Sequence, residues 1–371
     1  MRSLTKSSFA LSLGLAVAWP MTAHAAMAPQ AVADALVATF LKGQASFERV
    51  AAAGADVTLS GFKLVGEDGS TTTIATVLVV NPNPRASGGF TADRVTFDKG
   101  LVKSDGVNFE WQSGAVIGAV IPSAAEIKNK AGGIPFAKMT VAGISFEAPN
   151  LPDVMKIASM SVALGAVTNG IPHDVQASFD GIRVPLSFLE DEPEVQAMAK
   201  SLGYEGFTVG FGFDGLYDEG NDAVNVRSLT FSAEQVGKVV LSAKLAGVPL
   251  AKMSDPDDLF DTAKIGEFTV RFENTGIVDR VLDMQSKSAG VSRAELVDQT
   301  AGAIPLMLTL GAVGSEAFQA KVAAEATAFL KSPKSISFVA APASPMAFFD
   351  FFGLDPAEIV DALKLDVRAN R

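Results

Sequence analysis

His173 is the side chain in this sequence that comes closest to a catalytic base. The sequence has no cysteine, and its other histidine is His24 near the amino terminus. A Cys–His pair is therefore excluded, and a Ser–His–Asp triad would need His173 beside a serine on a Gly-x-Ser-x-Gly turn, which the sequence lacks. His173 follows Gly170-Ile-Pro172, a turn pattern, so we interpret it as a surface turn residue. We predict that the protein is not an enzyme.

Two other catalytic patterns are equally incomplete. Ser60-Gly-Phe-Lys63 matches Ser-x-x-Lys, but it lies in a strand pattern, whereas that chemistry places the serine at the start of a helix. A pair of carboxylates can hydrolyse a glycosidic bond, and the chain has 41 Asp and Glu residues, none of which the sequence singles out as a pair. A carboxylate-based hydrolase stays only as a distant alternative.

One loop carries oxygen ligands that calcium could use. Asp214 and the run Asp218-Glu-Gly-Asn-Asp222 are rich in carboxylates, but the spacing is not that of an EF-hand, and a hairpin turn explains the same residues. Whether this loop binds calcium is left open by the sequence. Zinc lacks a plausible ligand set, and we expect no metal and no cofactor.

A dense aromatic cluster is the candidate ligand-binding or partner-binding site. Four phenylalanines occupy five positions near the carboxyl terminus: Phe348, Phe349, Phe351 and Phe352. On a helix they would cover most of its circumference, so a single core contact would leave one face outside. The cluster therefore predicts either core packing or an exposed apolar lip for a lipid or a partner.

The first 25 residues predict a secretory signal peptide. A basic start with Arg2 and Lys6 precedes an apolar run over 9–19 and the site Ala23-His-Ala25, so we expect cleavage after Ala25. A helix over that run would be about 16 Å long, too short for a hydrocarbon core of about 30 Å. We expect a soluble protein, periplasmic or secreted, that is not an integral membrane protein after cleavage.

The composition limits the partners of the chain. Cleavage would remove two basic residues and change the net charge from −11 to −13, and the remaining Lys and Arg are scattered, so nucleic acid is not an expected partner. Without cysteine in an oxidising compartment, stability must come from packing.

The elements that would position such groups are mostly strands. Apolar residues alternate, as in one-sided antiparallel strands, at 107–111, 175–179, 207–213, 239–245 and 268–272. Turn sequences separate strands at 66–69, 81–84 and 218–222.

Helices are predicted at the amino end and in the carboxyl-terminal third. Capping patterns and apolar spacing indicate helices over 29–42, from Asp191 to Leu202, from Ser292, and from Ser315 to Pro333. The stretch 276–332 is therefore expected to be mainly helical. Within it, the apolar run Ala303–Val313 suits a buried helix or hairpin.

Internal repetition is the most informative pattern. Gly-Ile-Pro-Phe-Ala-Lys-Met at 133–139 returns as Gly-Val-Pro-Leu-Ala-Lys-Met at 247–253, and each copy is followed by a Pro-Asp helix start, at Pro152 and Pro256, and then a strand. A fainter third copy runs from Pro345 to Arg368.

A second pattern, apolar-x-Gly-apolar, centres on Gly61, Gly143, Gly181 and Gly247. Glycine inside a strand often marks a bulge, so each glycine predicts a bend where the strand switches its buried face.

These patterns predict an α+β, β-rich fold: a long curved, mostly antiparallel sheet built from duplicated strand–helix units and packed with helices from the carboxyl-terminal third. We divide the chain into a signal peptide (1–25), a first β-rich repeat region with an amino-terminal helix (26–187), a second β-rich repeat region (188–275), and a mainly helical region with a degenerate third repeat (276–371).

The alternating strands that end in apolar-Gly-apolar units, such as 239–250, and the closing segment 338–370 resemble AsmA-like and related exported β-rich envelope proteins of Gram-negative bacteria. The resemblance implies a long curved sheet with an apolar inner face and a role in envelope lipid handling or outer-membrane upkeep.

Our leading hypothesis is a non-enzymatic periplasmic envelope protein that binds lipid acyl chains or an apolar segment of another envelope protein in a groove. The alternative is a structural or interaction module of the envelope without a small-molecule ligand. A continuous, accessible apolar inner face would favour the first hypothesis, and a fully packed core with a polar exterior would favour the second.

Overall fold

The computed structural model describes residues 27–39, 44–129, 136–149, 151–168, 171–249, 262–310, 314–347, 350, 354 and 356–371. The predicted signal peptide lies outside the described residues.

One sheet of seventeen strands dominates the molecule. Its strands are β1 (Gln44–Ser46), β2 (Arg49–Ala53), β3 (Asp56–Val65), β4 (Thr71–Val80), β5 (Asn83–Pro84), β6 (Phe90–Ser104), β7 (Val107–Ile121), β8 (Lys138–Glu147), β9 (Met155–Leu164), β12 (Asp174–Pro185), β13 (Gly206–Asp218), β14 (Ala223–Ala233), β15 (Gly237–Ala246), β16 (Lys264–Asn274), β17 (Ser335–Ala340), β18 (Met346–Ala347) and β19 (Asp366–Ala369). The short strands β10 (Val167–Thr168) and β11 (Ile171–Pro172) pair only with each other.

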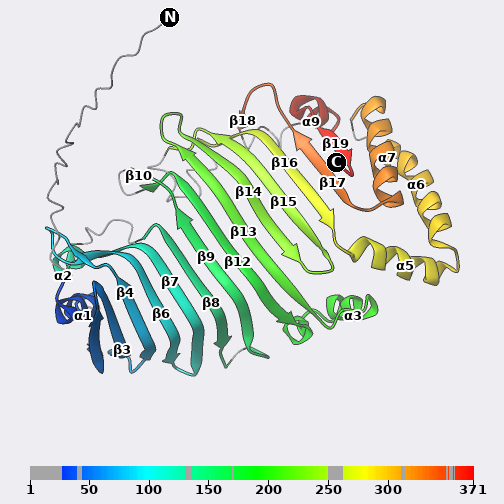
Figure 1. The fold of residues 1–371 in the computed structure, drawn as a ribbon. Coiled ribbons are helices and arrows are strands. Elements are labelled where there is room, and N and C mark those ends of the chain that lie inside the picture. The colour runs from blue at the N-terminus through cyan, green and yellow to red at the C-terminus, as the bar shows by residue number, and fades with distance from the viewer. Residues whose placement is uncertain are drawn as a thin grey trace, which may run out of the picture.

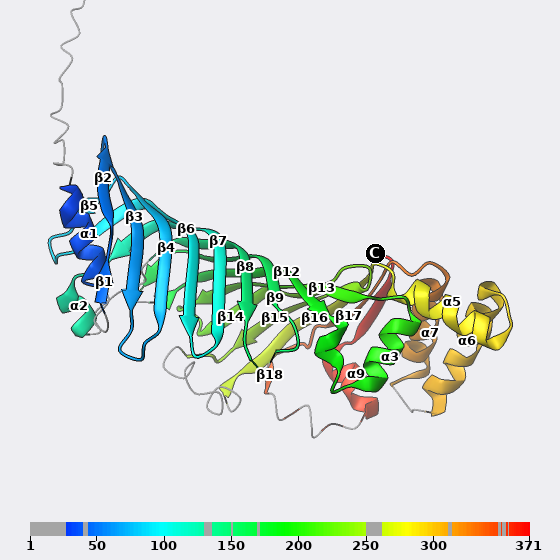
Figure 2. The same cartoon turned by 90° about the horizontal axis from the view of Figure 1, so that it is seen from below.

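The long strands follow one another across the sheet in chain order, every pair antiparallel. From β3 to β17 each long strand pairs with the long strand before it and the one after it, and β19 closes the far edge beside β17. The sheet is long, open and twisted (Figures 1 and 2). The predicted β-rich α+β class is therefore confirmed. The sheet also runs without a break across the boundary that the sequence suggested at residue 187.

Helices gather at the two ends of the sheet. They are α1 (Pro29–Val37), α2 (Ala124–Lys128), α3 (Pro193–Ser201), α5 (Ile277–Ala289), α6 (Arg293–Leu310), α7 (Glu316–Lys331) and α9 (Pro356–Leu363), with a 3-10 turn at Leu186–Leu189. Helices α1 and α2 lie at the amino-terminal end of the sheet and the others at the opposite end (Figure 1). None of the described helices combines the length and apolar character needed to cross a lipid bilayer.

The carboxyl-terminal helices confirm the capping predictions. Ser315 caps α7 by accepting a hydrogen bond from the Phe318 amide, and Ser292 and Glu295 form a reciprocal capping box at the start of α6. The run Ala303–Val313 was predicted to be buried, and that was wrong for its described part, because Leu306, Met307 and Leu310 of α6 are among the most exposed apolar side chains.

Three helix predictions need correction. Helix α1 ends at Val37 and not at residue 42. Helix α3 begins at Pro193 and not at Asp191, and no side chain caps it. Proline is favoured at the first helical position, because its missing N–H is no loss there. Residues 151–154 form a turn and not the helix predicted at Pro152: the Asp153 carboxylate accepts the Val154 amide at 2.7 Å, and the turn joins the neighbouring strands β8 and β9.

The repeat is partly visible. In the third copy the helix and the strand predicted after Ala347 are present as α9 and β19, and Met346–Ala347 form the short strand β18. In the first copy strand β8 is followed by a turn and β9. The corresponding helix start of the second copy, at Pro256, lies outside the described residues, as do residues 133–135 of the first seven-residue motif and 250–253 of the second.

The glycine pattern does mark bends, as predicted. Gly61, Gly143 and Gly181 lie within β3, β8 and β12 with φ angles of 65°, 64° and 65°, and Gly247 follows β15 with φ 70°. Around Gly61 the spacing between successive buried residues of β3 changes: Val57 and Leu59 are two positions apart, and Leu59 and Phe62 are three positions apart.

The predicted switch of the buried face at these bends was wrong. Val141 and Ile144, which flank Gly143, lie in one apolar cluster with Trp111. The buried spacing changes at the bend, so the apolar residues on both sides of Gly143 stay on one side of the sheet.

Candidate functional site

The candidate site is the apolar face of the sheet, which we define by two rows of side chains. In an antiparallel sheet, residues directly opposite each other on neighbouring strands point to the same side. The first row of register partners is Val50, Leu59, Val77, Phe97, Gly114, Val141, Met160, Phe179, Phe211, Phe231, Val239, Phe272, Ile336 and Ala369. The second row is Ala52, Val57, Val79, Val95, Val116, Met139, Val162, Ala177, Phe213, Leu229, Leu241, Val270, Phe338 and Val367. Neither row contains a polar side chain.

Helices cover part of the apolar face at its two ends, although Phe338 of the second row, in β17, is 47% exposed. At the amino-terminal end Val32 and Ala33 of α1 are buried in a cluster with Val57, Leu59 and Val79. At the other end the Phe272 ring meets the Phe329 ring of α7 edge to face, with 6.4 Å between centroids. These contacts are ordinary core packing.

The middle of the apolar face, from β12 to β15, is accessible. Phe179, Phe211 and Phe231 form a ladder of rings with centroids 6.3 and 5.3 Å apart. Phe231 is 52% exposed and Val239 beside it is 37% exposed. Large apolar side chains that remain open side by side, rimmed by a polar protein surface, are typical of a binding site.

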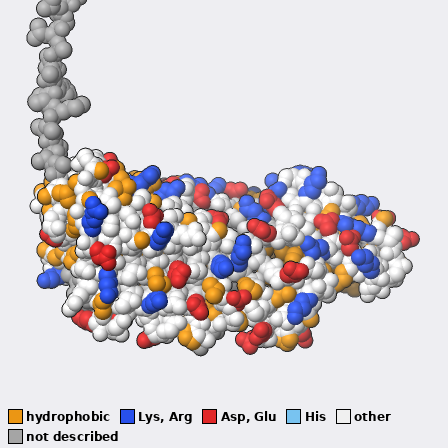
Figure 3. Space-filling model, turned by 60° about the horizontal axis from the view of Figure 1, so that its bottom comes forward, with side chains coloured by type: hydrophobic (Ala, Val, Ile, Leu, Met, Phe, Trp, Pro, Cys, Tyr) orange, Lys and Arg blue, Asp and Glu red, His pale blue; other side chains and the backbone are white. Residues whose placement is uncertain are grey.

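The opposite side of the sheet is polar. The row between the two apolar rows includes Thr96, Thr140, Ser161, Ser178 and Thr230. Figure 3 shows charged side chains of both signs spread over one face of the molecule, without a field of a single sign. The sheet therefore has one apolar side and one mainly polar side.

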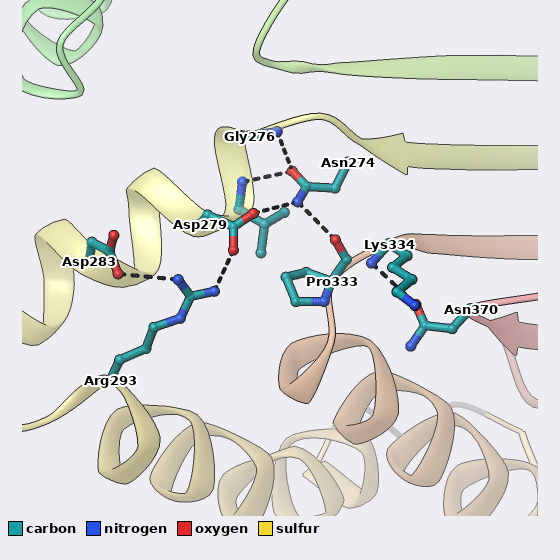
Figure 4. Close-up of polar contacts among 9 residues, drawn as sticks. Asn274, Gly276, Asp279, Asp283, Arg293, Pro333, Lys334 and Asn370 are labelled. Atoms are coloured by element: carbon teal, nitrogen blue, oxygen red, sulfur yellow. Dashed lines mark hydrogen bonds and ion pairs between the residues drawn. The ribbon is translucent and has the colours of Figure 1, made fainter.

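A polar network fixes the helical end of the sheet (Figure 4). Asn274, the last residue of β16, accepts hydrogen bonds from the amides of Gly276 and Val278 and donates to Asp279 and to the Pro333 carbonyl. Across the helix pair, Arg293 of α6 bridges Asp279 and Asp283 of α5, which lowers the pKa of Asp279 and raises that of Arg293. The network joins β16, α5, α6 and the start of β17.

The residues that the sequence singled out for chemistry do not come together. The Nε2 atom of His173 lies 3.7 Å from a carboxylate oxygen of Glu219, which is in the loop between β13 and β14. Ser60 and Lys63 lie in β3, as predicted. In the acidic loop Asp218 accepts from the Gly220 amide and from Asn221, which is turn bonding. Within the described residues no group of three acidic or histidine side chains is placed to hold a metal.

The phenylalanine cluster Phe348, Phe349, Phe351 and Phe352 lies outside the described residues, so its role stays a prediction. The aromatic residues that the structure does bring together, Phe179, Phe211 and Phe231, were missed as a site. Their strands were predicted from alternation, but the alternation within one strand does not determine its register with the neighbouring strand.

A family model described as "Uncharacterized protein" matches residues 230–370. The match begins within β14 and includes the Asn274 network. A search of curated proteins found no match.

Proposed function

We propose that the protein is a non-enzymatic envelope protein that binds lipid acyl chains on the apolar face between β12 and β15. The observation that carries this proposal is the pair of unbroken apolar rows, exposed in the middle of the sheet at Phe231 and Val239. Burying such surface under an acyl chain would be favourable by about 25 cal/mol per Å² of apolar area.

The dimensions of the apolar face suit an acyl chain. From Met160 to Phe272 the first row crosses five strand spacings, or about 24 Å at roughly 4.8 Å each. Acyl chains in one membrane leaflet span about half of a 30 Å hydrocarbon core. One chain can therefore lie along this part of the row.

The chemistry of the rows favours an acyl chain over an extended peptide. A peptide brings an N–H and a C=O at each residue, and these groups need hydrogen-bond partners when they are buried. The two rows provide no polar side chain. An acyl chain has no such requirement, and we assign it as the occupant. The second hypothesis, an interaction module without a ligand, predicts no saturable lipid binding.

The hydrolase alternative called for two buried carboxyl groups in a cleft. Within the described ranges the buried polar side chains are Ser286, Ser335 and Ser337, and no described Asp or Glu is buried. We therefore do not assign a reaction to the protein.

We further propose that the chain is exported and cleaved after Ala25, which would place it in the periplasm or outside the cell. Amino-terminal sequencing of the protein from a periplasmic extract should give Ala26 as the first residue. Recovery of intact Met1 would contradict export by cleavage.

Binding of palmitate to the purified protein, followed by isothermal titration calorimetry, tests the ligand class. Because Phe231 is half exposed, Phe231→Ser should leave folding intact and weaken binding about four- to twelvefold, since half of a phenylalanine burial of about 1.5–3 kcal/mol is lost.

Leu216→Ser is the matched control. Leu216 of β13 is, like Phe231, an exposed apolar residue, but its register partners are Asp174 and Asn225 and it lies on the polar side of the sheet. Equal affinity of the two variants, or no saturable binding by the wild-type protein, would refute the proposal.

A further inference from the structure

A hollow of about 680 Å³ crosses the sheet from β6 to β12 at the level of the bends. Its charged lining residues are Lys99, Glu110, Lys156 and Arg183. Lys156 and Arg183 are exposed, and the Ile157 side chain next to Lys156 packs into the Trp111 cluster. The charged side chains of the hollow therefore point to the polar side of the sheet, and Trp111, Ile144 and Ile157 of the apolar cluster also line it.

Two cations face each other in this hollow. Lys156 of β9 and Arg183 of β12 are direct register partners, and like charges in such positions destabilise a sheet. Neither forms an ion pair with any described carboxylate. Glu110 lies in the same row, but Ser145 separates it from Lys156, which puts it two strand spacings away, or about 10 Å.

Two of the bend glycines lie along the hollow, each packed closely against a neighbouring side chain. Gly143 and Gly181 line it, and a Cβ atom at Gly181 would lie 2.7 Å from the Cβ of Ala158. A Cβ at Gly143 would lie 2.6 Å from the Cγ of Gln112. Glycine within a strand is typical of positions that a ligand approaches closely.

We propose that this hollow binds a phosphate group through Lys156 and Arg183. The Arg183 guanidinium can bind two phosphate oxygens at once, and Lys156 adds a point charge from the neighbouring strand. Lys99 adds a third positive charge three strands from Lys156. Three cations and one carboxylate, Glu110, line the hollow, so it has a local excess of positive charge that favours phosphate although the net charge of the chain is −11. Phosphate bound there would also relieve the repulsion between the two cations.

Calorimetric titration with inorganic pyrophosphate tests the site in the wild-type protein and in Lys156→Gln and Arg183→Gln. Each variant should weaken binding at least tenfold. Neither should lower the melting temperature of the unliganded protein, because each removes one of two opposed like charges. Lys244→Gln is the control, because Lys244 is an exposed cation paired with Glu267 on β15 and β16, outside the hollow.

The source of the phosphate is distinguished by sedimentation with vesicles. Stronger binding to phosphatidylglycerol than to phosphatidylcholine vesicles, lost in Arg183→Gln, would support a lipid headgroup. Pyrophosphate binding without vesicle binding would support a soluble phosphate compound. Absence of both kinds of binding, or equal losses in Lys244→Gln and Arg183→Gln, would overturn the proposal. The palmitate test involves the other side of the sheet, so the two proposals can fail separately.

Discussion

The indole ring of Trp111 lies directly over Gly100, its register partner on the neighbouring strand: a Cβ atom at Gly100 would be 1.8 Å from Cζ2 of Trp111. The relationship is repeated one step along, where the Phe97 ring lies over Gly114. The two rings meet edge to face at 6.0 Å, and the Trp111 indole N–H donates to the Phe97 carbonyl at 3.2 Å. Each glycine is therefore required by the aromatic residue opposite it.

Gly100→Ala should destabilise the protein by about 1–3 kcal/mol, because the added methyl group must displace the Trp111 ring from a packed cluster. Urea unfolding followed by circular dichroism measures the loss, and Trp111 fluorescence should shift to longer wavelength. Gly212→Ala is the control, since its Cβ would make an ordinary 3.6 Å contact with Thr230. Equal midpoints for the two variants would contradict this account.

Asn274→Ala should cost about 1–3 kcal/mol, because it removes the hydrogen bonds donated by the Gly276 and Val278 amides at the start of α5 and leaves partly buried donors and acceptors without partners. Thermal unfolding should show this loss. Asn221→Ala removes one exposed hydrogen bond to Asp218 and should change stability by less than about 0.5 kcal/mol. Equal melting temperatures for the two variants would show that the Asn274 network does not stabilise the helical end of the sheet.

Acid should weaken the contact between Glu126 and its neighbours. The Ser123 amide and the Arg85 guanidinium, which donate to the Glu126 carboxylate, lower its pKa from 4.5 to about 2. A lowered pKa means that this stabilisation is complete above pH 4.5 and is lost as the pH falls toward 2. The melting temperatures of wild type and Glu126→Gln should therefore differ most at neutral pH and converge over that interval. Curves that stay parallel down to pH 2 would exclude the effect.

The apolar end of α6 should contribute little to stability. Leu310 is 78% exposed, so Leu310→Ser should change the free energy of unfolding by less than about 0.5 kcal/mol. Leu282 of α5 is 5% exposed, and Leu282→Ala should cost about 2–5 kcal/mol. Chemical denaturation of both variants checks the contrast. A large loss in Leu310→Ser would mean that this surface is covered in solution.

The sequence predicts individual elements of this fold better than it predicts their assembly. Alternation over 207–213 predicts β13, and Ser315 and Ser292 predict the starts of α7 and α6, because these signals are local. Pro152-Asp153 is typical of a helix start, but the residues that join β8 to β9 are few and form a turn. Here the tertiary connection overrides the local preference.

The candidate site depends on register, which is not local. Phe179 faces Phe211 only because the pairing of β12 and β13 shifts between Phe179 and Ile182. A one-residue difference there would turn the ladder toward the polar side. The exposure of Leu306 was missed for a related reason: an apolar run does not say whether a second layer will cover it.

The chain-order pairing of the strands has a consequence for how the molecule forms. Since each long strand hydrogen-bonds to the long strand before it, the sheet can grow by one strand at a time at a single moving edge, in the order in which an exported chain would emerge. Contacts between sequence neighbours favour rapid folding, but an unpaired edge invites pairing with other chains. Growth stops at β19, where Glu325 of α7 accepts the Ala369 amide at 2.7 Å and Asn370 donates to the Ala328 carbonyl. Helix α7 thus serves as a terminator of strand addition, and a chain truncated before Glu316 should polymerise.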